Sequence, residues 1–177
     1  MPHLASHIIQ LPVFSVQDGG ILGRVQKLIV NPDDFKIVML QVHLQTKFRP
    51  RYLLPHDIKL VDNNKLIIES ANDLAEDEDL VRLKPYIKQP FLLCGANVVT
   101  QSSKKLGRVN DFSLSTNDFT ATKLYLKSRS IWQFFYASHI IDRNMVVDVK
   151  DDNKTIVVKD STIKLQKTSP SVLPAKS

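Results

Sequence analysis

Five histidines and a single cysteine are the side chains of this chain that most often take part in catalysis or metal binding. Ser138 and His139 are adjacent, and neighbouring residues of a strand point in opposite directions, so they do not predict a catalytic dyad. His3 and His7 have a spacing that suits a metal only on a formed helix. Cys94 lies in an apolar run, which favours a buried structural thiol over a nucleophile. The sequence therefore predicts no catalytic residue, no metal site and no cofactor.

A different chemistry is suggested by two segments in which basic and aromatic side chains are interleaved. Alternate residues of an extended segment point to one side, so the basic groups would share a face. Such a face could hold RNA through backbone charge and base stacking, or it could bind an acidic protein surface. The third interpretation is a solvated loop with its aromatic residues turned into the core. The candidate partner-binding residues are Lys47, Arg49, Arg51, Tyr52, Lys127, Arg129 and Trp132.

Composition narrows the class of protein. The 177 residues are 43% hydrophobic, which is enough for a packed core, and the net charge of +6 permits nucleic-acid contact without demanding it. There is no run of about 18 apolar residues that could span a bilayer, and the N-terminus lacks the features of a secretory signal. A single cysteine excludes an internal disulfide and a four-thiolate zinc site. We expect a soluble cytoplasmic protein.

The sequence Leu-Gly-Arg-Val occurs twice and marks a diverged internal repeat. Residues 22–42 align with residues 106–126 without a gap, and seven of the 21 positions are identical. Ordinary composition would give roughly one or two matches by chance. Further along, Leu54–Ile58 is matched with Tyr136–Ile140. The chain is therefore interpreted as one small module written twice.

Each copy is expected to consist of short strands separated by polar turns, a pattern typical of small barrels or sandwiches. Gly23 and Gly107 lie at equivalent places, inside a strand just after a turn. A glycine there marks a bulge or a tight corner where a side chain would clash, or it simply ends the turn. The strands expected after the first hairpin turn are 22–30, 36–44, 52–54, 58–61 and 65–69 in the first copy, and 97–100, 107–114, 122–126, 134–136, 146–149 and 155–159 in the second.

Between the copies, residues 72–83 are predicted to form one short helix. Asn72 can cap it, acidic residues crowd its first turns, Arg82 lies near its end, and Pro85 would stop it. The predicted units are a first domain at 8–70, an acidic helical linker at 71–90, a second domain at 91–163 and a flexible tail at 164–177.

The order of these motifs resembles the PRC-barrel family. The shared pattern is a turn, then Leu-Gly-x-Val, a strand, an Asn/Asp-rich turn ending in Phe, an apolar strand, and Leu-Leu-Pro-x-x-Ile. The resemblance covers about residues 11–70 and 94–160, although the second copy has Ala137 where the first has Pro55. It implies small β-barrels, similar to those of the photosynthetic reaction-centre H subunit and of RimM-type ribosome maturation factors. It also implies a module that binds and does not catalyse.

We therefore expect an all-β fold with two small antiparallel PRC-barrel-like barrels in tandem and a short connecting helix. Barrels of about 60 residues are marginal alone, so the two are expected to pack against each other or to form a homodimer. The favoured function is a non-enzymatic cytoplasmic adaptor that docks a protein partner. The alternative is a RimM-like factor bound to RNA or a ribosomal particle, motivated by the resemblance and a pI near 9.4.

Overall fold

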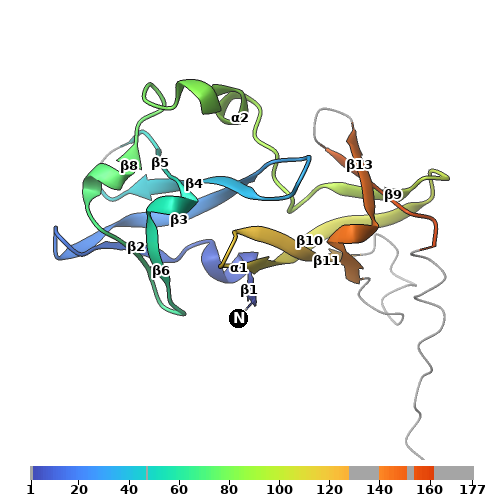
Figure 1. Ribbon diagram of the computed structural model, residues 1–177, viewed down its shortest axis with the longest axis horizontal. Coiled ribbons are helices and arrows are strands. Elements are labelled where there is room, and N and C mark those ends of the chain that lie inside the picture. Colours follow the sequence, from blue (N-terminus) through green and yellow to red (C-terminus); the bar gives the residue numbers. More distant parts are fainter. Residues whose placement is uncertain (1, 47, 128–139, 151–153, 162–177) are drawn as a thin grey trace, which may run out of the picture.

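The computed structural model describes residues 2–46, 48–127, 140–150 and 154–161. Strands dominate, and they form two sheets that lie side by side along the longest axis of the molecule (Figure 1). The predicted all-β class is confirmed. Within the described ranges, no helix is long and apolar enough to cross a membrane.

The first sheet is built from the first copy of the repeat. All its neighbouring strands are antiparallel except β2 and β7, which are parallel. A 3-10 turn, η1 (Pro55–Asp57), connects β5 to β6. In the order β6-β7-β2-β3-β4-β5-β8, its strands are β6 (Ile58–Val61), β7 (Leu66–Ile68), β2 (Pro12–Ser15), β3 (Gly20–Val30), β4 (Ile37–Leu44), β5 (Arg51–Leu53) and β8 (Leu74–Ala75).

The second sheet repeats this strand order, including a parallel pair formed by β14 and β9. A 3-10 turn, η5 (Arg143–Met145), takes the place of η1. The predicted strand at 134–136 lies outside the described residues, and the other predicted strands are confirmed within a few residues. In the order β13-β14-β9-β10-β11-β12, the strands are β13 (Val146–Lys150), β14 (Thr155–Val158), β9 (Asn97–Thr100), β10 (Lys105–Ser115), β11 (Thr120–Lys127) and β12 (Ile140–Asp142).

Strand pairing corrects the alignment of the two copies in their later parts. Leu40 on β4 pairs with Leu53, and its counterpart Leu124 on β11 pairs with Ile141. Thirteen positions separate the first pair and seventeen the second, so the second copy has four extra residues between these strands. The predicted match placed the counterpart of Leu54–Ile58 six residues too early and is wrong. Local similarity of residue types could not locate an insertion in the intervening loop.

The connection between the copies is not the single helix predicted over 72–83. It contains the 3-10 turns η2 (Ala71–Asp73) and η3 (Val81–Leu83), with β8 between them, followed by the helix α2 (Lys84–Lys88). Ser70 and Asp73 form a capping box at the start of η2, in which the Asp73 carboxylate accepts the backbone N–H of Ser70, but no longer helix follows because the next residues pair with β5 as β8. Pro85 lies in the first turn of α2, where its missing N–H costs nothing, so it starts a helix that it was expected to stop.

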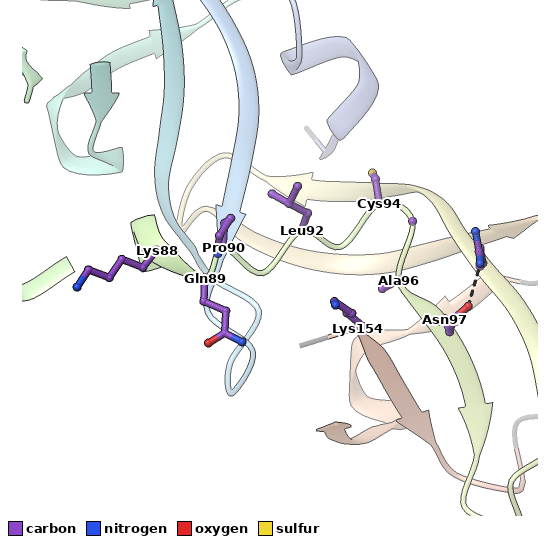
Figure 2. A pocket seen from close by; sticks show the side chains of 10 residues that line it. Lys88, Gln89, Pro90, Leu92, Cys94, Ala96, Asn97 and Lys154 are labelled. Atoms are coloured by element: carbon purple, nitrogen blue, oxygen red, sulfur yellow. Dashed lines mark hydrogen bonds between the residues drawn. The ribbon is translucent and has the colours of Figure 1, made fainter. Parts of the chain in front are cut away.

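This connection covers the outer face of the first sheet at β3, β4 and β5. Ile29, Met39 and Tyr52 on those strands are buried there together with Leu80 from the connection. Figure 1 shows α2 lying beyond the sheet on this side. Figure 2 shows the chain continuing from Lys88 through the extended segment that leads into the second copy.

The two copies meet at equivalent turns. The Ile37 N–H donates to the Phe119 carbonyl oxygen at 2.7 Å, and the Ala121 N–H donates to the Phe35 carbonyl oxygen at 2.9 Å. Phe35 and Ile37 are the counterparts of Phe119 and Ala121 in the repeat, so an approximate twofold axis relates these two hydrogen bonds. Both phenylalanines have positive φ, 60° for Phe35 and 51° for Phe119. We call this contact the seam.

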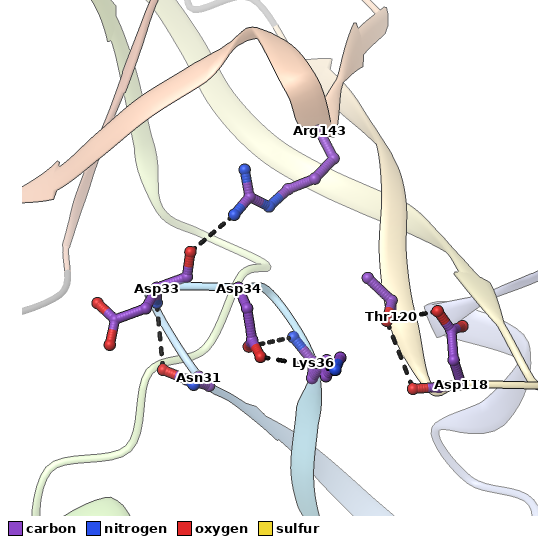
Figure 3. Close-up of polar contacts among 7 residues, drawn as sticks. All are labelled: Asn31, Asp33, Asp34, Lys36, Asp118, Thr120 and Arg143. Atoms are coloured by element: carbon purple, nitrogen blue, oxygen red, sulfur yellow. Dashed lines mark hydrogen bonds and ion pairs between the residues drawn. The ribbon is translucent and has the colours of Figure 1, made fainter.

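A side chain of the second copy closes the seam over the first. Arg143 Nη2 donates to the Asp33 carbonyl oxygen at 2.7 Å (Figure 3), and the guanidinium lies 4.4 Å from the centroid of the Phe35 ring. On the other side, Thr120 Oγ1 donates to the Asp118 carboxylate at 2.9 Å and tightens the second turn (Figure 3). The seam therefore combines backbone pairing, a cation–π contact and local turn bonds.

Each copy also sends its leading segment across the seam. β1 (Pro2–Leu4) pairs antiparallel with β10, and the short helix α1 (Ala5–Ile8) follows it. The Ser6 N–H, in that helix, donates to Asp111 Oδ1 on β10 at 3.1 Å. The segment at the start of the copy thus belongs to the sheet of the other copy.

The reciprocal segment precedes β9. Val30, at the end of β3, donates its N–H to the Phe91 carbonyl oxygen at 3.0 Å. The fully buried ring of Phe91 lies 5.8 Å from that of Phe35, centroid to centroid. The buried residues of the two copies form one continuous core. The prediction that the copies pack against each other is confirmed, and exchanged segments are the reason.

Gly23 is required for steric reasons, and Gly107 has a backbone conformation that favours glycine. A Cβ on Gly23 would lie 2.2 Å from the backbone carbonyl oxygen of His43 on the paired strand, so no side chain fits. Gly107 has a φ of 146° and lies where the β9–β10 register shifts, which is a position that favours glycine. Neither glycine merely ends a turn.

Candidate docking surface

Four apolar side chains form a row across the outer face of the first sheet. Phe14 on β2 pairs with Ile21 on β3 and with Ile67 on β7, and Ile67 pairs with Leu60 on β6. Directly paired residues of neighbouring strands point to the same face of a sheet. The four residues therefore form one line across four strands, which we call the outer stripe.

The outer stripe is open to solvent at both ends. Ile21 is 47% exposed and Leu60 is 54% exposed, while Phe14 and Ile67 between them are half-buried. The core face of the same strands is separately filled, since Val13 and Leu66 are fully buried. The stripe is thus additional to the core, and contiguous exposed apolar surface of this kind marks interaction sites.

A basic side chain lies over the middle of the outer stripe. Lys65 Nζ lies 4.7 Å from the centroid of the Phe14 ring, in a cation–π contact that keeps its charge over the stripe. Lys59, next to Leu60 on β6, pairs with Glu69 at 3.5 Å. The surface therefore offers an apolar line with positive charge over its centre.

The equivalent row of the second sheet has a different chemistry. Val99 on β9 pairs with Lys105 on β10 and with Val157 on β14, and Val157 pairs with Asp148 on β13. Charged residues stand at both ends, and valines replace the larger residues at the centre. The same strand arrangement is thus stable without an apolar stripe, so the fold does not require one in the first copy.

The sequence comparison agrees with this architecture. Residues 3–75 match the family model of the PRC-barrel domain. This match assigns residues 3–75 to the PRC-barrel domain. No curated protein matches the sequence. The outer stripe lies entirely within the matched residues. The match runs along the chain from β1 to β8, so it includes every strand of the first sheet.

The basic residues predicted from the first PRC-barrel copy face acidic residues of the connection. Arg51 forms an ion pair with Glu76 and its side chain is only 13% exposed. Arg49 Nη1 lies 3.5 Å from Glu78 Oε1. Tyr52 is buried beneath them, and burial, together with the nearby Asp77 charge, raises the pKa of its hydroxyl. Much of the basic charge of this segment is therefore neutralised within the chain.

The rest of the predicted basic-aromatic set is only partly placed. Lys47, Arg129 and Trp132 lie outside the described residues. Lys127 is exposed at the end of β11, where it pairs with Arg108 on β10. The two basic segments still fall at equivalent connections of the repeat, between β4 and β5 and between β11 and β12, but the four extra residues remove their residue-by-residue match.

The single thiol is held in a protonated state. Burial raises the pKa of Cys94 to about 11, and the nearby carboxylate of Asp111 contributes to the same shift. A thiol with that pKa carries little thiolate at neutral pH, in line with the predicted structural role. In the described part of the chain, no three His, Cys, Asp or Glu residues are grouped so that they could hold a metal ion.

The sequence did not single out the outer stripe, although it carried a signal for it. Val13 and Ser15 define the buried face of β2 by alternation, which leaves Phe14 on the outside. Leu66 and Ile68 do the same for β7 and leave Ile67 outside. What the sequence could not provide was the register that sets these outward residues in one row.

Proposed function

We propose that this protein is a non-enzymatic adaptor of the cytoplasm that docks a protein partner on the outer stripe of its PRC-barrel domain. The single observation that carries the proposal is the exposed apolar row from Ile21 to Leu60, which the second copy replaces with charged ends. A row of exposed apolar side chains is the kind of surface that protein partners bind, and Lys65 adds one positive charge to it.

The partner is expected to present an apolar segment with acidic residues beside it. Lys65 lies over the Phe14 ring and supplies positive charge at the centre of the stripe. Opposite charge on the partner would steer association and fix its orientation. Neutralisation of Arg49 and Arg51 by Glu78 and Glu76 favours an apolar protein surface over a nucleic-acid backbone.

The test places a photo-crosslinking amino acid at position 21 of the full chain in its native cell, with position 105, the counterpart in the second copy, as the matched control. We expect protein adducts from position 21 and at least tenfold fewer from position 105. The additional change L60D, which transplants the charge of Asp148, should reduce the adducts from position 21 at least tenfold because it disrupts one end of the row.

A second control separates the stripe from general surface hydrophobicity. Val81 is 67% exposed in the connection, so V81K removes exposed apolar surface elsewhere and should leave the adducts unchanged. Equal yields from positions 21 and 105 would contradict docking on the stripe. Adducts dominated by RNA at position 21 would contradict a protein partner and support the ribosome-associated alternative.

A further inference from the structure

A second site lies where the connection enters the second copy. A cavity of about 570 Å³ opens between the end of α2 and the start of β9 (Figure 2). This volume falls within the range of about 300–1,000 Å³ that is common for small-ligand sites. It is remote in sequence from the outer stripe, since its lining begins at Lys88.

The cavity is lined by cations from three separate elements. Lys88 ends α2, Arg108 lies on β10, and Lys154 immediately precedes β14. None of the ten described residues that line the cavity is acidic. The Lys88 side chain extends away from the other labelled liners in Figure 2, so Arg108 and Lys154 supply the positive charge that attracts an anion, and neutral liners such as Gly95 allow it to approach the backbone.

Arg108 is oriented by a neighbouring side chain. Its Nε donates to Asn97 Oδ1 at 3.1 Å, and the bond is visible beside the cavity in Figure 2. The guanidinium is planar, so a bond through Nε fixes the plane in which both terminal nitrogens lie. Among the described residues, no hydrogen bond occupies those terminal nitrogens. They remain available as a fork that matches phosphate geometry.

The counterpart in the first copy is occupied differently. Arg24 stands at the same position of the Leu-Gly-Arg-Val repeat, and its Nη1 donates to the Gln10 carbonyl oxygen at 2.9 Å. That bond closes the segment before β2, so this arginine has a structural partner. Both copies therefore have the arginine. Among the described residues, only the arginine of the second copy has no hydrogen-bond partner for either terminal nitrogen.

We propose that the cavity binds a phosphate group carried by a small molecule. Arg108 would take two phosphate oxygens through its fork, and Lys154 would balance part of the remaining charge. The site is separate from the outer stripe and does not depend on the protein-docking function.

The test follows backbone amide signals of Gly95 and Asn97 in the ¹⁵N-labelled full chain during titration with inorganic phosphate and, separately, ribose 5-phosphate. Chloride at matched ionic strength is the reference. We expect saturable shifts with both phosphate probes and none with chloride. Tighter binding of ribose 5-phosphate supports a phosphorylated metabolite, and equal affinities support recognition of the anion alone.

Two variants with the same loss of charge distinguish a site from general attraction. R108Q should weaken phosphate binding about tenfold or more, because it removes charge-assisted hydrogen bonds. R24Q should leave the affinity within about twofold, because Arg24 lies outside the cavity. Equal weakening by both variants, or shifts that do not saturate, would overturn the proposal. Tighter binding of a single-stranded oligonucleotide, with a steep salt dependence, would overturn the assignment to a small molecule.

Discussion

The two copies of the repeat agree where they touch each other and differ where they face solvent. At the seam, hydrogen bonds from Ile37 and Ala121 are related by the repeat. On the outer faces, the row that ends in Ile21 and Leu60 in one copy ends in charged residues in the other. Each copy contributes the same turn residues to the seam, so a change in either copy affects the contact between them. The outer faces do not contact each other, so the residues of each can change independently. The difference teaches that function should be sought on the faces that diverged.

The seam itself is not fully symmetric, and replacing its two phenylalanines should reveal this. Phe35 is fully buried against Phe91 and Arg143, whereas Phe119 is half-buried. F35A is expected to lower the free energy of unfolding by about 3–5 kcal/mol, and F119A by about 1–2 kcal/mol. Urea denaturation of the full chain measures both.

F35L is the control for this pair, because it keeps apolar volume and should cost less than F35A. If F35A and F119A were equally destabilising, the seam would be energetically symmetric. The asymmetric closure by Arg143 would then contribute nothing measurable.

Replacing each of the two repeated glycines by alanine should lower the stability of the fold by different amounts. G23A places a Cβ against the backbone of His43, which cannot move without disturbing the β3–β4 pairing, so about 2–3 kcal/mol should be lost. G107A meets an unfavourable φ and should cost about 1 kcal/mol. Thermal unfolding of the two variants compares them, and a larger loss for G107A than for G23A would contradict this order.

The sequence predicted the repeated architecture because its signals are local. Turn residues such as Asp18 and alternation such as that of Val13 and Ser15 depend on neighbours in the chain. The predicted helix at 72–83 failed because Leu74 and Ala75 pair with β5, and because Leu80 is held against the first sheet by contacts distant in sequence. Composition could not report those contacts.

The candidate site was harder to predict for the same reason. Arg49 and Arg51 form a basic pattern in the sequence, but the acids that face them come from a separate segment. The outer stripe depends on register, which sets Phe14 beside Ile67 although more than fifty residues separate them. The exchange of β1 across the seam left no local pattern at all. Local sequence patterns thus predict helices, strands and turns, while the candidate sites depend on how elements distant in sequence pair with each other.

The smallest expected effect concerns Asp18 and Asp160, whose carboxylates form the hydrogen bonds that hold the hairpin turn of each copy. In the first copy, Asp18 lies in the turn; the Ser15 hydroxyl and then the Ala71 N–H, which donates at 2.8 Å, lower its pKa. In the second copy, Asp160 lies beyond β14, and the hydroxyl and N–H of Ser102 in the turn lower its pKa. The same closure is therefore achieved with the carboxylate on the opposite partner.

A lowered pKa in the folded state means that each carboxylate stabilises the fold at neutral pH. That contribution is lost as the pH falls below the ordinary carboxyl pKa and through the lowered one. D18N and D160N should each make the loss of stability between about pH 5 and pH 2 shallower, by a similar amount, while D33N controls for net charge. Urea midpoints measured across that range test the equivalence. If only D18N made the loss of stability at acid pH shallower, the carboxylate would stabilise the turn of the first copy but not that of the second. The two turns would then be closed by similar hydrogen bonds that contribute different free energies.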